Sequence, residues 1–547
     1  MIPRPPRGAL RRLLVAWLAI VTGTWALVIA LAVHALDAYG AGAVGAVLAA
    51  RLIPALLAGP VTAGLADRGD RARLVAVMAA VEAIAFAGAA VVILVGGPLA
   101  ALLALVAVGG AAGTAVRPGL EALMPALADT PAELTSATAW WSALDSVGFL
   151  LGAGAGGVAV AAIGAGEVIA VAAGLIALGA GLAIALPRVR AAEADEPADE
   201  TLIGEALGGL RALREIPALR TPVRLFACLL LLEGTTDVLV VVLAIRKLDM
   251  GNGGPGVLYI LWGVGGLVAS GLLLMLLRRR GYGLALAVGV LGHAAGLVLM
   301  GLDGIPLAIA AAIPAGIGFA LVEFATMALA PRLADDAVLG RVYGLLEIIY
   351  AGLSGLGALL GPLLVVGLGA TGGLAATGGA YALVGVATWR SLRRLDSGQE
   401  DAGRVRELLR GVPFLAPLPL PRLERLVRGA HPLASRRGET IVSRGGIGES
   451  LYVIEDGTVE VAEYGRRLGP GASFGEIALL HDVPRTASVR ALSDVRMRVL
   501  DRRSFLAAMS SHEDARSLAH EVAADHLAQA EVQSRSSGAS TLTGPER

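Results

Sequence analysis

Residues 13–36 read LLVAWLAIVTGTWALVIALAVHAL, an apolar run without a single Asp, Glu, Lys or Arg. A helix needs about 20 apolar residues to cross the hydrocarbon core of a bilayer, so this run can span it. The basic stretch before the run resembles the start of a signal peptide, but the run is too long for the apolar part of such a segment. We therefore expect the first transmembrane helix here.

Similar apolar runs recur through the first 395 residues. Glycines, prolines and charges divide them into twelve predicted helices, centred near residues 24, 54, 85, 107, 149, 176, 233, 266, 292, 317, 354 and 381. Residues 1–399 hold 25 basic and 25 acidic residues, and residues 400–547 hold 20 of each. Charged residues make up about 13% of the first part and about 27% of the second, and the second value is typical of soluble domains. The composition thus predicts a membrane region followed by a soluble module.

The loops differ sharply in positive charge. If the N-terminus lies inside, 22 arginines fall in inside segments, whereas the outside loops hold only Arg246 and Lys247. Positive charge gathers on the cytoplasmic side of membrane proteins, so we expect both termini in the cytoplasm. The chain's 45 basic and 45 acidic residues balance, which argues against a nucleic-acid partner. The single cysteine, Cys228, allows no disulfide within the chain.

Short motifs repeat along the membrane region at offsets of 206 to 211 residues. The repeated pairs are Gly23-Thr24 with Gly234-Thr235, Pro125–Asp129 with Pro331–Asp335, and Gly148-x-x-x-Gly152 with Gly357-x-x-x-Gly361. The constant offset predicts two related six-helix halves, at about residues 10–187 and 220–395. The charged segment 188–219 would link them on the cytoplasmic side.

The loop between the second and third predicted helices reads Ala63-Gly-Leu-Ala-Asp67-Arg68-Gly-Asp-Arg71-Ala-Arg. It resembles the G-x-x-x-D-R-x-G-R-R signature of the major facilitator superfamily, although three signature positions differ. Helix five carries Gly148-x-x-x-Gly152-Ala-x-x-Gly-Gly, which is similar to that family's export-associated motif with alanine in place of proline. The stretch 117–148 is similar to bacterial efflux members. The resemblance covers about residues 10–395.

The resemblance implies a secondary transporter in which Asp67, Arg68 and Arg71 form a gate on the cytoplasmic side, and the alternative is that these residues only anchor the topology. Ionisable residues deep in a membrane by default indicate function. Glu233 and Asp237 lie deepest and are four residues apart, so they share a helix face and are candidates for proton coupling. Alternatively, each is neutral or hydrogen-bonded to a neighbouring helix.

Further candidates for intramembrane function are weaker. Asp145 and Glu347 could instead pair with Arg117 or Arg71, and we expect His293 to be a packing residue. The remaining candidates are Arg51, Glu82 and Glu323.

The soluble module changes pattern along its length. Residues 404–429 have helical periodicity broken by a Pro-rich turn, and short alternating stretches between Gly-containing turns follow from about residue 430, as expected for antiparallel strands. A last helical pattern covers about residues 503–533, and residues 534–547 have the composition of a disordered tail. We therefore divide the chain into a membrane domain (1–395), a helical connector (396–429), a strand-rich domain (430–533) and the tail.

Residues 474–489 read FGEIALLHDVPRTASV. They closely resemble the phosphate-binding cassette of cyclic nucleotide-binding domains, and residues 438–457 resemble the β-roll of the same domain. Arg485 can neutralise a cyclic phosphate, Gly475 permits close backbone approach, and Glu476 can accept a hydrogen bond from the ribose 2′-hydroxyl. The expected site comprises Gly475, Glu476, Ile477, Ala478, Arg485, Thr486 and Ala487. Arg516 is a candidate for covering the base.

The expected fold is an all-α membrane bundle of twelve helices in two halves, followed by a soluble β-roll with flanking helices. We predict proton-coupled efflux of a small molecule, regulated by cAMP or cGMP with cAMP favoured, in a bacterial inner membrane. The expected partners are the nucleotide, the small-molecule substrate and the lipid bilayer. We expect no enzyme activity, catalytic residue, cofactor or metal site. The alternatives are a membrane-anchored nucleotide receptor without transport and a nucleotide-regulated lipid transporter or scramblase.

Overall fold

The computed structural model describes residues 8–524, apart from residues 69, 188–201, 280, 303, 335 and 511. Within helices, the description also leaves out the side chains of residues 60–68, 131, 202–203, 205–207, 278–279, 336–337, 397–400 and 420–421. The predicted tail and residues 188–201 of the charged segment between the halves thus lie outside the described residues. The chain separates into two compact units, Met1–Asp396 and Ser397–Arg547.

Eleven helices in the described part of the chain are long and apolar enough to cross a membrane. The last candidate, Val338–Arg410, lies in α14 (Asp336–Arg410), where two helices meet at Gly369. Gly369 has φ 70° and ψ 170°, a conformation that glycine adopts readily because it lacks a Cβ atom. Divided at Gly369, α14 supplies two candidate spans, which brings the candidates among the described residues to the predicted twelve.

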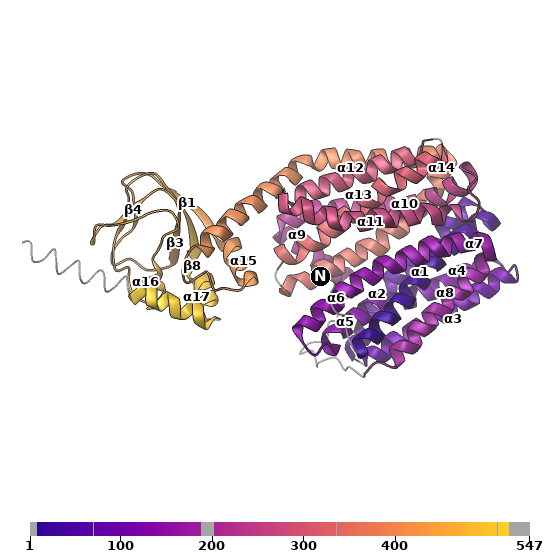
Figure 1. The fold of residues 1–547 in the computed structure, drawn as a ribbon, viewed down its shortest axis with the longest axis horizontal. Coiled ribbons are helices and arrows are strands. Elements are labelled where there is room, and N and C mark those ends of the chain that lie inside the picture. Colours follow the sequence, from indigo (N-terminus) through magenta and orange to yellow (C-terminus); the bar gives the residue numbers. More distant parts are fainter. Residues whose placement is uncertain are drawn as a thin grey trace, which may run out of the picture. The chain divides into compact units, whose positions relative to one another are not determined.

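The helices of the first unit form two groups, which Figure 1 shows as an indigo-to-purple bundle beside a pink one. The first half consists of α1 (Ala9–Tyr39), α2 (Ala41–Arg68), α3 (Arg71–Leu94), α4 (Leu99–Gly113), α5 (Val116–Leu127), α6 (Pro131–Phe149), the π-helical segment η1 (Leu150–Gly156), α7 (Gly157–Ile163) and α8 (Ala165–Ile184). The second half consists of α9 (Leu202–Glu215), α10 (Pro217–Val242), η2 (Leu243–Lys247), α11 (Gly254–Arg279), α12 (Tyr282–Met300), α13 (Ile305–Leu333) and α14.

The repeated glycines make equivalent helix contacts in the two halves. A Cβ atom at Gly152 would collide with the Thr22 carbonyl oxygen of α1, and one at Gly357 would collide with the Leu231 carbonyl oxygen of α10. The Thr235 hydroxyl of α10 also donates a hydrogen bond to the Gly357 carbonyl oxygen at 3.0 Å. Small residues four apart let helix backbones approach closely, so the repeat in sequence corresponds to a repeat in packing.

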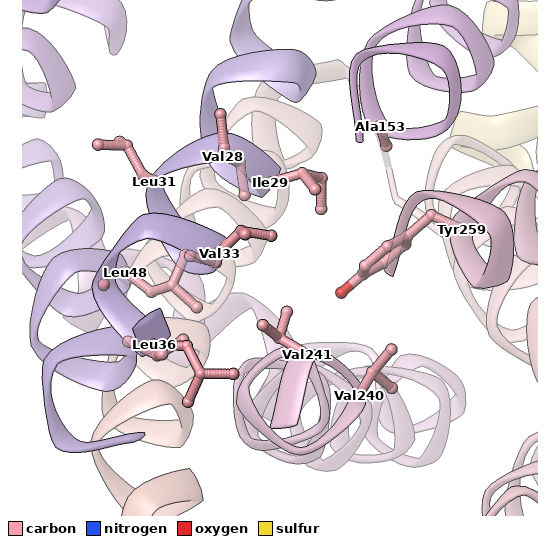
Figure 2. Close-up of a cluster of buried hydrophobic side chains, with 14 of the residues drawn as sticks. Val28, Ile29, Leu31, Val33, Leu36, Leu48, Ala153, Val240, Val241 and Tyr259 are labelled. Atoms are coloured by element: carbon pink, nitrogen blue, oxygen red, sulfur yellow. The ribbon is translucent and has the colours of Figure 1, made fainter. Parts of the chain in front are cut away.

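Apolar packing joins the two halves at one end. One cluster, here called the shared apolar cluster, takes buried side chains from both halves, and Figure 2 shows its part around α1, α2, η1, α10 and α11. At the same end, the Arg246 guanidinium lies 3.7 Å from the Asp37 carboxylate and donates to the Leu36 carbonyl oxygen. Elsewhere each half has an apolar cluster of its own, within residues 10–186 or within residues 212–395.

The second unit is built on two four-stranded antiparallel sheets. Their strand orders are β1-β8-β3-β6 and β2-β7-β4-β5. The strands are β1 (His431–Ser435), β2 (Thr440–Val442), β3 (Ser450–Asp456), β4 (Val459–Val461), β5 (Arg466–Leu468), β6 (Ser473–Phe474), β7 (Val489–Ala491) and β8 (Val495–Asp501). Buried side chains such as Ile454, Val459 and Met497 form a core between the sheets. The expectation of short antiparallel strands from about residue 430 is therefore confirmed.

Helices cover one side of these strands. They are the end of α14, α15 (Leu420–Gly429), α16 (Glu476–Leu480), α17 (Arg502–Ser510) and a helix over residues 513–524. Apolar residues of α14, α15 and α17 share a core with Leu451, Val453 and Leu500 of β3 and β8. One prediction is wrong here: the last helical pattern is not continuous, because His512 is non-helical between α17 and the next helix.

Candidate functional site

The short helix α16 begins directly after a glycine in a left-handed conformation. Gly475 follows β6 and has φ 97° and ψ 0°. A Cβ atom there would lie 2.5 Å from Nη1 of Arg485 and 3.0 Å from the Ser450 carbonyl oxygen. Both the backbone angle and the lack of space therefore require glycine at this position.

Arg485 is buried against this turn, with 7% of its surface exposed. Its Nη1 donates to the Gly475 carbonyl oxygen at 2.9 Å, and its Nη2 donates to the Ser450 carbonyl oxygen at 2.8 Å. The guanidinium also lies 5.7 Å from the centroid of the Tyr452 ring, which stacks on Phe474. Burial lowers the pKa of Arg485, although Tyr452 and Glu476 act in the opposite direction. The cassette thus holds a positive charge in a fixed orientation, on neutral carbonyl acceptors.

The other predicted cassette residues surround this arginine in the sequence and differ in exposure. Glu476 and Ala478 on α16 are buried, with 1% and 2% of their surfaces exposed, whereas Ile477, Thr486 and Ala487 are half-buried. Arg516 is exposed on the helix over residues 513–524. On that helix the ring centroid of His520 lies 5.5 Å from that of His481, which follows α16.

Sequence reasoning did not assign two groups that hold Arg485. The Ser450 carbonyl oxygen comes from β3, 35 residues away, and a backbone carbonyl leaves no signature in the sequence. Tyr452 is part of the stretch that resembles the β-roll, but only its pairing with Phe474 across β3 and β6 brings it to the arginine.

Gly475→Ala is expected to weaken cyclic-nucleotide binding about ten- to hundredfold. The added Cβ would displace the Arg485 guanidinium, and a hydrogen bond to a charged group contributes about 1.5–3 kcal/mol. Gly465→Ala is the matched control, since Gly465 also has a positive φ of 61° but open space around its Cα. Calorimetric titration with cAMP and cGMP measures the difference. Equal affinities for the two variants would show that the contact with Arg485 is unimportant.

In the membrane unit, Glu233 and Asp237 lie on α10 and have different environments. The Tyr259 hydroxyl of α11 donates a hydrogen bond to Oδ1 of Asp237 at 2.6 Å. Oε2 of Glu233 is buried and has no hydrogen-bond partner in the described part of the chain. Arg51 of α2 is near enough to interact electrostatically with Asp237, and Glu323 of α13 with Glu233. Charged groups of both halves therefore interact electrostatically with this pair.

A second charged group surrounds Arg117 on α5. The arginine lies 3.7 Å from Asp145 of α6 and 3.2 Å from Glu121, and its guanidinium lies 5.4 Å from the centroid of the Trp17 ring. Asp145 thus pairs with Arg117, one of the two partners considered from the sequence. Glu347 of the second half interacts with the same arginine electrostatically.

The two remaining buried candidates have contrasting surroundings. Glu82 has 3% of its surface exposed, and its Oε2 has no hydrogen-bond partner among the described residues. His293 is fully buried, with Nδ1 3.0 Å from the Ala315 carbonyl oxygen and its ring between Trp262 and Tyr381. This packing agrees with the structural role expected for His293.

The predicted gate is only partly described. The side chains of Asp67 and Arg68, at the end of α2, lie outside the described residues, and Arg71 is a half-buried residue at the start of α3. Asp70, to which the sequence reading assigned no role, caps α3 by accepting hydrogen bonds from the backbone N–H groups of Ala72 and Arg73. An aspartate directly before a helix is a recognisable capping signal.

The connector is tied to the strands of the second unit by ion pairs. Arg498 on β8 donates to Asp401 at 2.7 Å and to Glu455 at 3.3 Å. Partial burial acts to raise the pKa of Asp401, but hydrogen bonds and charges from Arg498 and Arg404 outweigh it and hold the pKa below its usual value. Arg406 and Glu424 join α14 to α15 at 2.6 Å. Residues 401–424 are therefore part of the soluble fold rather than a loose tether.

Comparison with known proteins gives two family matches. The Major Facilitator Superfamily matches residues 13–355, more than half of the chain, and the cyclic nucleotide-binding domain matches residues 433–512. The second region is similar to cGMP-dependent protein kinases. The match is 35% identical over 104 residues for the Caenorhabditis briggsae kinase and 33% over 109 residues for isozyme 1 of Drosophila melanogaster. These matches cover 18% and 19% of this chain and 14% of each kinase, so the chain spans only a small part of those relatives.

The membrane unit has the fold of a solved transporter. The crystal structure of the nucleoside transporter NupG aligns with 71% of this chain and 99% of its own, with a TM-score of 0.57 and 14% identity. At that identity the likeness concerns the fold alone. The chain is thus a multi-pass membrane protein that belongs to the Major Facilitator Superfamily of transporters, not an enzyme, and it carries a C-terminal cyclic nucleotide-binding domain.

Proposed function

We propose that this transporter couples efflux of a small molecule to proton entry through Glu233 and Asp237, and that cyclic nucleotide, with cAMP favoured, regulates it. The observation that carries the regulatory part is the buried Arg485, whose guanidinium is fixed by two backbone carbonyls beside the left-handed Gly475. A cyclic phosphate carries one negative charge, which such an oriented guanidinium can neutralise with charge-assisted hydrogen bonds. Glu476 is proposed for the ribose 2′-hydroxyl, and Ile477, Ala478, Thr486 and Ala487 complete the site.

The transport part is supported by the groups around the carboxyl pair. Glu233 has a buried oxygen without a hydrogen-bond partner in the described residues, and Arg51 and Glu323 approach the pair from opposite halves. Ionisable groups at such a place are costly and mark ion or proton pathways in transporters. Rocking of the halves would change the surroundings of both carboxyls and could alternate their access to protons.

The apolar clusters support an alternating-access cycle, and they support assigning this structure to a state of that cycle that is closed towards the outside. The distribution of arginines supports an orientation in which the end with Asp37 and Arg246 faces the outside of the cell, and the shared apolar cluster joins the halves at that end. At the other end each half has its own cluster, so this arrangement corresponds to a transporter sealed towards the outside. We place it in a bacterial inner membrane with both termini in the cytoplasm, and Asp67, Arg68 and Arg71 form the proposed gate on that side.

Regulation would act through residues 390–412. Within the second unit, Asp401 of this segment is held by Arg498 of β8. Nucleotide binding can bias the transporter only through a difference in affinity between its two states. We propose that movement of the cassette changes the position of the connector and thereby favours one state.

Flux into liposomes containing the full chain tests the proposal. Under an imposed pH gradient, we expect cAMP on the side of the nucleotide-binding domain to change accumulation of at least one solute about fivefold or more, the lower end of typical coupling. The solute panel should include organic cations, organic anions, nucleosides and labelled lipids, each with cAMP, with cGMP and without nucleotide. Arg485→Glu is the control that should not respond. Nucleotide binding without any effect on flux would refute the regulation.

Two alternatives predict other results in the same assay. A membrane-anchored nucleotide receptor would bind cAMP with normal affinity but move no solute in the panel. A nucleotide-regulated lipid transporter or scramblase would redistribute labelled lipid and leave the small molecules untouched.

A further inference from the structure

Tyr259 connects the proposed proton site to the shared apolar cluster. This cluster closes the proposed outer end of the membrane unit and is here called the outer seal. Its hydroxyl donates to Oδ1 of Asp237 at 2.6 Å, which is short for a hydrogen bond and typical of a charged acceptor. The tyrosine lies on α11 and has only 5% of its surface exposed. No motif in the sequence marks it, because its partner lies 22 residues away on another helix.

The ring of Tyr259 belongs to the shared apolar cluster. Figure 2 shows it extending from α11 towards Val240 and Val241 of α10, with Ala153 of η1 and Ile29 of α1 also around it. These neighbours come from both halves of the membrane unit. The same side chain therefore packs in the seal between the halves and bonds to a carboxylate of the proposed proton site.

We propose that Tyr259 is a positioning residue that keeps Asp237 as the ionised member of the carboxyl pair, directs the transported proton to Glu233, and ties the pair to the outer seal. This role rests on the proposed proton coupling. A hydrogen bond donated to a carboxylate stabilises its charged form. Asp237 receives that bond and Glu233 does not, so the first proton bound by the pair goes to Glu233.

The other charged and titratable groups around the pair fit this division. Arg51 of α2 carries a positive charge near enough to interact electrostatically with Asp237. Glu233 interacts electrostatically with Glu323 of α13 and Tyr381 of α14, neither of which brings it a positive charge. When Glu233 is neutral, Asp237 remains as a single negative charge that accepts the hydrogen bond of Tyr259.

Infrared difference spectroscopy of the full chain in liposomes tests the assignment without a transported substrate, because the proton is the probe. The carbonyl band of protonated carboxyls is followed as the pH changes, and Glu233→Gln identifies its contribution. In Tyr259→Phe the second midpoint of the pair, at which Asp237 takes up its proton, is expected to move upward by about one pH unit, because Asp237 loses a hydrogen bond that favours its charged form. The shift should vanish when Asp237→Asn is already present.

Tyr282→Phe is the matched control for the infrared titration. Tyr282 is also a buried tyrosine of the second half, with 3% of its surface exposed, but its hydroxyl makes no hydrogen bond within the described residues. Its variant should titrate like the parent protein. An unchanged titration in Tyr259→Phe would overturn the proposal, and so would an equal shift in both variants. Proton-coupled flux is measured separately from the infrared titration. A failure of the proposed transport function can therefore be told apart from a failure of the role assigned to Tyr259.

The proposed link between Tyr259 and the outer seal is tested separately, by the rate at which a cysteine placed in the seal is labelled. Cys228 is the only cysteine, so Cys228→Ser gives a background in which Val241→Cys can be labelled with a membrane-impermeant maleimide from outside. We expect labelling to be several-fold faster with Tyr259→Phe. Asp237→Ala, which removes the acceptor of the same hydrogen bond, should have the same effect if the tyrosine variant does not fold. Labelling at the parent rate in a folded variant would overturn the tie to the seal.

Discussion

Arg485→Glu is expected to abolish cyclic-nucleotide binding, with a loss of affinity of about 1000-fold or more. The wild-type guanidinium is already oriented by the Gly475 and Ser450 carbonyl oxygens, so little reordering opposes binding of a phosphate. Glutamate would remove both donors and place a negative charge against the ligand. Truncating one partner of a buried charge pair costs about 2–5 kcal/mol, and a reversed charge adds repulsion, so about 4 kcal/mol is a reasonable minimum.

Calorimetric titration with cAMP and cGMP measures this loss. The matched control is Arg490→Glu, because Arg490 is an exposed arginine of β7 whose Nε bonds to the Gly438 carbonyl oxygen, outside the cassette. Arg485→Lys keeps the charge but not the two-pronged geometry and should bind with intermediate affinity. The membrane unit should remain folded in all three variants. Unchanged nucleotide affinity in Arg485→Glu would disprove the assignment of the phosphate site.

Glu233→Gln is expected to remove proton-driven accumulation while leaving exchange of substrate across the membrane. Glutamine keeps the size and polarity of the side chain but cannot bind and release a proton. The substrate gradient would then no longer follow the pH gradient, and the affinity change that links proton and substrate, about 5- to 150-fold in typical coupled systems, would disappear. Asp237→Asn should also reduce accumulation, because it changes the charge of the pair and its bond with Tyr259.

Accumulation with and without a pH gradient, compared with exchange in the absence of a gradient, separates coupling from a general loss of transport. Glu167→Gln is the control, since Glu167 is an exposed carboxyl in the first turn of α8. It should transport like the parent protein. If both Glu233→Gln and Asp237→Asn still accumulate substrate in proportion to the pH gradient, the protons are coupled elsewhere. Glu82, whose buried oxygen also has no partner among the described residues, would then be the next residue to test.

Local patterns predicted much of the fold and part of the site. The apolar runs, the glycine spacing and the positions of turn residues depend on neighbours in the sequence, and they anticipated the membrane helices, the repeat of glycine motifs in the two halves and most strands. The break between α17 and the helix over residues 513–524 was missed, because helical periodicity continues across it. In α14 the sequence pattern had already predicted two helices, and the structure shows that they meet at Gly369.

By itself the sequence determined the membrane and soluble parts, the number of crossings and the cassette, because each depends on composition or on residues close together in the chain. Only the tertiary structure decided which groups meet. It brought Ser450 to Arg485, Arg117 to Asp145 and Tyr259 to Asp237. It also showed apolar side chains of both halves packing at one end of the membrane unit. These contacts join separate helices and strands, and a pattern along one element carries no information about the partner that will cover it.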